Sequence, residues 1–178
     1  MPDRALVVVD MINSYDHPDG DLLVASAEEA VPVIADLIAR ARDSGTPVIY
    51  VNDNFGHWRS DSRALVETTG RGEHAGLVEP IVPDDDAMIV VKARHSIFYQ
   101  TPFEYLLRQK GIGEIVLTGQ VTEQCILYSA LDAHIRHIPA TVPRDAVAHI
   151  HEDLAEAALR MMELNMETDV VAAEEVRF

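Results

Sequence analysis

The sequence has a single cysteine among its 178 residues. This scarcity excludes an internal disulfide and any metal site built from several cysteines. Basic residues are also few, since 14 Lys and Arg stand against 30 Asp and Glu. The resulting formal charge of −16 argues against a nucleic-acid-binding surface, which would need a basic patch or stripe.

Long apolar runs are missing as well. No stretch approaches the roughly 20 apolar residues that a membrane-spanning helix requires. The chain begins MPDRALVVVD, where the apolar run is short and leads into an acidic residue, unlike a secretory signal. We therefore expect a cytoplasmic protein that binds neither membranes nor nucleic acids.

Short β-branched runs recur along the chain and predict strands. Two of them, Leu6–Val9 and Ile89–Val91, are apolar at every position. Continuous apolar runs are typical of strands covered on both faces in a parallel sheet. The six predicted strands are Ala5–Asp10, Pro47–Asn52, Met88–Ala93, Glu114–Thr118, Ala140–Pro143 and Asp169–Ala172.

Helical patterns separate these strands. Ser26 is expected to cap the first helix, because Glu29 follows it three residues later, and Thr101 and Thr122 are expected to cap two others. The four predicted helices are Ser26–Ser44, Thr101–Lys110, Thr122–His137 and His151–Met166.

Strands that alternate with helices predict an α/β fold with right-handed crossovers. We expect one domain over residues 1–178, a three-layer α/β/α sandwich around a doubly wound parallel sheet of about six strands. The irregular segment Phe55–Val82 is expected to lie over the sheet edge, as a lid or a contact surface.

Three chemically capable residues lie at or just past the ends of predicted strands: Asp10, Lys92 and Cys125. Each has an ordinary structural explanation, as a turn residue, a solvated charge or a small buried side chain. Ligands of open parallel sheets, however, bind beyond the carboxyl ends of the strands. The three residues could therefore converge on one crevice.

Cys125 is the most informative of the three, because it lies in the first turn of a predicted helix. The helix dipole and a neighbouring Lys92 ammonium would both favour the thiolate and lower the thiol pKa. Asp10 could then accept the thiol proton and return it to a leaving group. Backbone N–H groups of the same helix terminus could stabilise an oxyanion.

Three stretches of the chain resemble the isochorismatase-like cysteine hydrolases, a family that includes nicotinamidases and N-carbamoylsarcosine amidases. They read ALVVVDMINSY, VVKARHSIFYQTPFEYLL and EIVLTGQVTEQCILYSALDA, in that order along nearly the whole chain. The resemblance assigns an Asp–Lys–Cys triad to Asp10, Lys92 and Cys125. It also implies a cis peptide between Gln120 and Val121 and an oxyanion hole made by the N–H groups of Val121 and Cys125.

The implied reaction is attack by the thiolate on a small amide or carbamoyl compound, followed by hydrolysis of a thioester. The resemblance further implies a homodimer or homotetramer, for which Phe55–Val82 is the preferred interface. Two alternatives remain open. One is vinyl ether hydrolysis of the isochorismatase type, in which the cysteine is incidental, and the other is a non-catalytic binding protein.

Metal binding is not expected, and no cofactor is implied. The nicotinamidase branch has an Asp-x-His metal motif after its second strand, whereas this chain has Asp53 followed by Asn54 and then Phe55. His57 would need a different geometry to reach a metal.

Four further residues are candidates for binding the substrate. Asn13 follows the first strand, and aromatic side chains often line apolar pockets. A turn-forming or core role is the alternative for each of them. The four candidates are Asn13, Trp58, Phe98 and Tyr99.

Overall fold

In the computed structural model, residues 3–56, 67, 69–70 and 72–178 are described. Their strands form one parallel sheet in the order β3-β2-β1-β4-β5-β7, with the short strand β6 paired to β4. The chain first runs outward from β1 to β3 and then returns to β4 beside β1. The sheet is therefore doubly wound, and the predicted α/β fold class is confirmed.

The six predicted strands lie within two residues of their predicted bounds. The strands of the structure are β1 (Arg4–Val9), β2 (Val48–Asp53), β3 (Met88–Lys92), β4 (Glu114–Gln120), β5 (Ala140–Pro143), β6 (Val147–Ala148) and β7 (Asp169–Val171). The described residues thus form seven strands rather than about six. The additional strand, β6, escaped prediction because only Val147 and Ala148 pair with β4.

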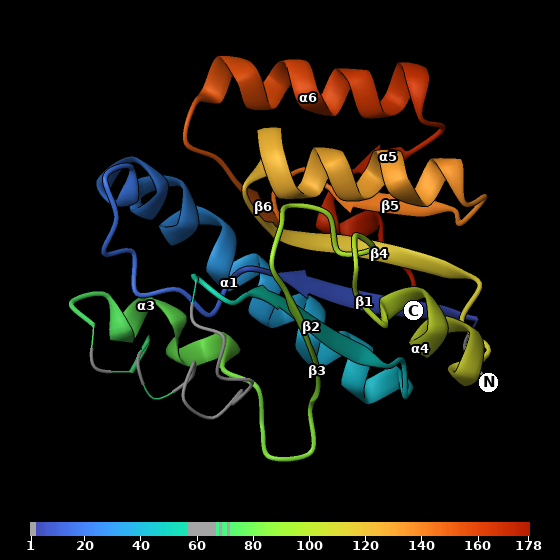
Figure 1. Cartoon of the computed structure of the whole chain (residues 1–178), viewed down its shortest axis with the longest axis horizontal. Coiled ribbons are helices and arrows are strands. Elements are labelled where there is room, and N and C mark those ends of the chain that lie inside the picture. Colours follow the sequence, from blue (N-terminus) through green and yellow to red (C-terminus); the bar gives the residue numbers. More distant parts are fainter. Residues whose placement is uncertain (1–2, 57–66, 68, 71) are drawn as a thin grey trace.

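Helices cover both faces of the sheet. They are α1 (Gly20–Ser44), α3 (Ala75–Val78), α4 (Phe103–Lys110), α5 (Leu127–Ile135) and α6 (Glu152–Asn165), with 3-10 turns at Glu79–Ile81 and Ala173–Glu175. In Figure 1, α5 and α6 lie side by side, while α1 passes behind β1 and β2.

Alternate residues of β1 separate the two layers of the core. Leu6 and Val8 pack in the cluster that includes the buried side of α1. Val7 and Val9 pack in the cluster that includes side chains of α4, α5 and α6. Because successive strand residues point to opposite faces, one apolar strand supplies both layers.

The predicted start of the first helix is wrong. Helix α1 begins at Gly20, six residues before Ser26, and Ser26 lies within it. The Ser26 hydroxyl instead contacts His149 Nδ1 at 3.0 Å and accepts the His149 N–H at 3.0 Å. At Gly20, a Cβ atom would lie 1.9 Å from the Tyr15 carbonyl oxygen, so the close approach requires glycine.

The predicted cap at Thr122 also differs from the structure, whereas Thr101 bonds the start of its helix. Thr122 does not cap a helix with its side chain, since its hydroxyl donates to the Ala148 carbonyl 2.9 Å away. Helix α4 begins at Phe103, and Thr101 accepts the Phe103 N–H at 3.3 Å from just before it.

Part of the segment expected to be irregular is helical and packed. Val78 and Ile81, in the described part of Phe55–Val82, are buried in the cluster that includes α1. Most of residues 57–71 lie outside the described part of the chain, so the lid or interface role stays a prediction. None of the described helices is long and apolar enough to cross a bilayer.

Candidate active site

Asp10 lies immediately after β1, at the carboxyl edge of the sheet. Its backbone has a φ of 56°, and its side chain is buried. One carboxylate oxygen, Oδ1, accepts the Asp53 N–H at 2.7 Å, and the Asp10 carbonyl accepts the Gln120 amide at 2.7 Å. Hydrogen bonds from the ends of β2 and β4 thus hold Asp10 in place.

Lys92 is the last residue of β3, and its ammonium group joins the strand ends. Its side chain is fully buried. The Nζ atom lies 2.8 Å from Asp10 Oδ2, 3.4 Å from Asp53 Oδ2 and 3.7 Å from Cys125 Sγ. A buried ammonium needs such partners, because desolvating an unpaired charge is costly.

Cys125 lies in a π-helical turn, Thr122–Ile126, between β4 and α5. The peptide bond from Gln120 to Val121 just before this turn is cis. The Asp10 carboxylate raises the pKa of the thiol, and the Val121 backbone lowers it. The sulfur therefore has a carboxylate near it that can accept its proton.

The electrostatics of Cys125 differ from the prediction. Burial, together with the negative charge of Asp10, raises the pKa of the thiol to about 12 and outweighs the opposing effect of Lys92. Burial and Asp10 thus favour the protonated thiol, whereas the sequence led us to expect the thiolate. The turn that carries it is a short π-helical one, and the sulfur is buried beside a carboxylate.

Burial also raises the pKa of Asp10, although Lys92 opposes the shift. For Lys92, burial lowers the pKa, but the attraction of Asp10, Cys125 and Asp53 outweighs it and the net shift is upward. A carboxylate with a raised pKa is a stronger base, and the cation beside it stays charged. Together they can take a proton from the thiol and stabilise the charge that develops on sulfur.

Three of the four candidate substrate-binding residues lie in the described part of the chain, and Phe98 shares a buried cluster with Cys125. Asn13 accepts the Tyr15 N–H at 2.7 Å, as a turn-forming residue does. Phe98 packs edge-on against Phe103, with the Arg136 guanidinium over its ring. Tyr99 is exposed. Trp58 lies outside the described residues.

The structure brings two residues to the site that sequence reasoning did not place there. Asp53 contacts Lys92 with its side chain and Asp10 with its backbone. His95 lies with Nδ1 3.9 Å from Cys125 Sγ. His95 belongs to the stretch VVKARHSIFYQ, three residues after Lys92, but its spacing alone carries no sign of this contact.

The described residues also bear on metal binding. No group of three or more His, Cys, Asp or Glu side chains in that part of the chain is arranged to hold an ion. Asp53 is engaged by Lys92 and by the Phe55 N–H, while His57 lies outside the described residues.

Comparisons with a protein family and with individual proteins point to the same family. The family described as "Isochorismatase domain" matches residues 4–175. An uncharacterised isochorismatase family protein of Bacillus subtilis, YaaI, is 32% identical over 98% of this chain and 96% of its own length. The maleamate amidohydrolase of Pseudomonas putida is 29% identical over 87% of this chain and 76% of its own length.

A solved structure extends the likeness to three dimensions. The N-carbamoylsarcosine amidase of Thermoplasma acidophilum superimposes with a TM-score of 0.74 and 31% identity over the full length of both chains. The resemblance read from the three sequence stretches is thereby confirmed, and the chain belongs to the isochorismatase family.

Proposed function

We propose that the protein is a cysteine hydrolase that cleaves the C–N bond of a small amide or carbamoyl compound. One observation carries the proposal: the Lys92 ammonium contacts both the Asp10 carboxylate and the Cys125 sulfur, at 2.8 and 3.7 Å. A nucleophile, its proton acceptor and a stabilising cation therefore share one buried site. Names of relatives such as maleamate amidohydrolase and N-carbamoylsarcosine amidase support C–N hydrolysis.

In the first step, Cys125 Sγ attacks the substrate carbonyl carbon as its proton passes to Asp10. Lys92 stabilises the negative charge that develops on sulfur, and the N–H groups of Val121 and Cys125 stabilise the carbonyl oxygen. Asp10 then gives the proton to the leaving nitrogen as the C–N bond breaks. Ammonia or an amine leaves, and the acyl group remains on sulfur as a thioester.

In the second step, water adds to the thioester carbonyl and the C–S bond breaks. The products are a carboxylic or carbamic acid and the free thiol. We also propose, from the family resemblance, that the enzyme is cytoplasmic and works as a homodimer or homotetramer.

The test is a screen of small amides, ureas and carbamoyl compounds for ammonia release, with Cys125→Ala as the blank. On any accepted substrate we expect Cys125→Ala and Asp10→Asn each to abolish turnover. Hydrolysis of a vinyl ether substrate such as isochorismate that survives Cys125→Ala but not Asp10→Asn would instead support hydrolysis of the isochorismatase type. No turnover on any compound, with Cys125 inert to acylating reagents, would support a non-catalytic binding protein.

A further inference from the structure

His95 is the contact of the Cys125 sulfur that the proposed steps leave unused. Its Nδ1 atom lies 3.9 Å from Sγ, within reach for a hydrogen bond to sulfur. His95 is exposed, whereas Asp10 and Lys92 are both buried. The imidazole is therefore the titratable neighbour of the sulfur that solvent water reaches.

The segment that carries His95 is fastened to the helix that follows the cysteine. The Ser96 hydroxyl donates to the Asp132 carboxylate, and the Ile97 N–H donates to the Ser129 hydroxyl at 3.1 Å. Both acceptors belong to α5, which begins two residues after Cys125. These bonds fix the residues next to His95 relative to the sulfur.

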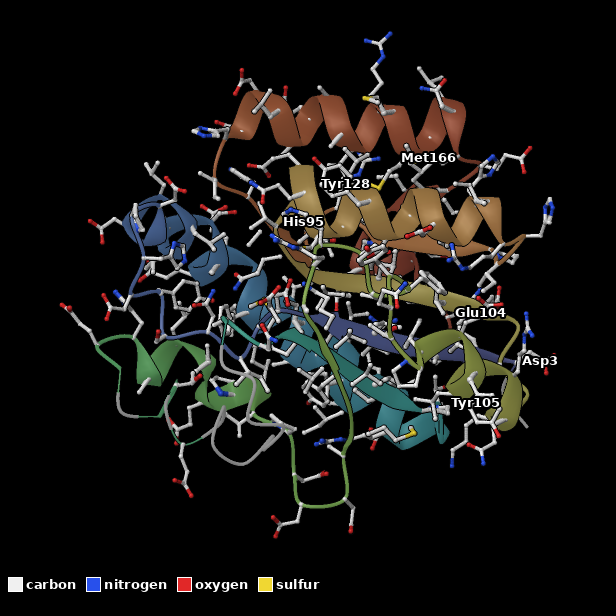
Figure 2. All side chains as sticks on the ribbon, in the orientation of Figure 1. Asp3, His95, Glu104, Tyr105, Tyr128 and Met166 are labelled. Atoms are coloured by element: carbon white, nitrogen blue, oxygen red, sulfur yellow. The ribbon has the colours of Figure 1, made fainter. Side chains whose placement is uncertain are left out.

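The imidazole ring also has a partner of its own. Tyr128 of α5 meets it edge-on, with the ring centroids 5.4 Å apart and an interplanar angle of 74°. Figure 2 shows the two side chains together, His95 from the segment after β3 and Tyr128 from α5. Because Tyr128 packs against the imidazole and hydrogen bonds fix the residues next to His95, the ring is held in position before the reaction, as a proton carrier must be.

We propose that His95 is a further catalytic residue, the general base that activates water for hydrolysis of the Cys125 thioester. This inference rests on the proposed function and assigns its second step. The Nδ1 atom, in the tautomer with hydrogen on Nε2, accepts a proton from water as the water oxygen bonds to the thioester carbonyl carbon. The C–S bond then breaks, and His95 returns the proton to Sγ. The sum is thioester plus water giving an acid and a thiol.

Asp10 is less suited to this second step than to the first. Its carboxylate is buried and engaged by Lys92 and the Asp53 N–H. A general base must meet its water within hydrogen-bond distance, and the exposed imidazole beside Sγ can do so. Proton transfer is thus divided, with Asp10 serving acylation and His95 serving deacylation.

The two steps separate with 4-nitrophenyl acetate, whose leaving group needs no proton. The wild type should release nitrophenolate in a burst while Cys125 is acetylated, then turn over steadily. In His95→Asn we expect an unchanged burst rate and a steady rate about 100-fold lower, the smaller of the factors usual for a general base. Intact-mass measurement should show the acetyl group accumulating on Cys125.

His137→Asn is the matched control, because His137 is an exposed histidine beyond the far end of α5. It should keep both rates. Added imidazole should restore the steady rate of His95→Asn, which a purely structural defect would not allow. Burst and steady rates that fall together, or a steady rate that does not fall, would overturn the proposal. Absence of any Cys125 acetylation in the wild type would instead refute the proposed function itself.

Discussion

The Lys92 ammonium lies 2.8 Å from the Asp10 carboxylate, although their strands are not neighbours in the sheet. Strand β2 runs between β1 and β3, and its last residue, Asp53, touches both partners. The Lys92 side chain is 0% exposed and that of Asp10 is 9% exposed. Neither charge can be solvated by water, so each depends on the other.

Removing one member of this pair should therefore destabilise the fold. In Lys92→Met the Asp10 carboxylate is left buried without its cation, and we expect the free energy of unfolding to fall by about 3–5 kcal/mol. Urea denaturation at neutral pH measures the change. The double variant Asp10→Asn/Lys92→Met should recover much of the loss. A single variant within about 0.5 kcal/mol of wild type would contradict the pairing.

Alkylation of Cys125 should report its raised pKa. Iodoacetamide reacts with thiolate, so with a pKa of about 12 the labelling rate should rise about tenfold per pH unit from pH 7 to 10 without a plateau.

The Asp10 charge is one cause of that raised pKa. Asp10→Asn should lower the pKa of the thiol and accelerate labelling at pH 8 while abolishing turnover. Slower labelling of Asp10→Asn would show that the carboxylate does not repel the thiolate.

The buried hydroxyl of Tyr50 allows a test of how the core contributes to stability. Tyr50 is 1% exposed, and its hydroxyl has no hydrogen-bond partner among the described residues. A buried hydroxyl without a partner costs about 1–3 kcal/mol, so Tyr50→Phe should unfold at a higher urea concentration than wild type. Tyr15→Phe is the comparison, because the Tyr15 hydroxyl does donate to Gln120, at 3.3 Å. If both variants lost the same amount of stability, the prediction for Tyr50 would be contradicted.

The same tyrosines should make the protein sensitive to alkali. Burial raises the pKa of Tyr15 and of Tyr50 from 10.0 to about 12. A group whose pKa is raised by folding contributes stability that is present below its unfolded pKa and lost as pH rises through its folded pKa. Melting temperature should thus fall between pH 9 and 12, less steeply in Tyr50→Phe. Equal slopes would indicate that Tyr50 ionises freely in the folded protein.

Gly119 should tolerate no side chain. Its φ is +107°, and a Cβ atom would lie 2.1 Å from the Val9 carbonyl oxygen in the central strand pair. We expect Gly119→Ala to lower stability by more than about 3 kcal/mol or to prevent folding, as judged by circular dichroism and urea denaturation. Gly76→Ala is the control, since a Cβ there meets nothing within 4 Å. Equal stability of the two variants would refute the close approach.

Strand positions could be predicted well from sequence because burial on both faces of the sheet requires apolar residues at every position of a strand. Leu6–Val9 and Ile89–Val91 are apolar throughout, and both lie in strands. Helix ends were predicted less well, because the hydroxyl groups of Ser26 and Thr122 form hydrogen bonds with residues in and beside β6 rather than with their own helices. Their partners, His149 and Ala148, are distant in sequence, so no local pattern reveals them.

The site was predictable where chemistry coincides with a strand end, as at Asp10 and Lys92. The state of the Cys125 thiol was not, because its pKa depends on burial and on the distance to the Asp10 charge. His95 escaped for a related reason. Its approach to sulfur depends on bonds from Ser96 and Ile97 to α5, which appear only once the sheet and helix have packed.

The central pairing of β1 with β4 has a consequence for how the protein folds during its synthesis. The bond from Gln120 to Asp10 closes a separation of 110 residues, and parallel pairing at such range is entropically demanding and slow. During synthesis, Asp10 and Lys92 emerge from the ribosome before the sulfur does. Cys125 and Asp10 can meet only when β4 docks against β1, so a partly folded chain carries the proposed nucleophile without its proposed base.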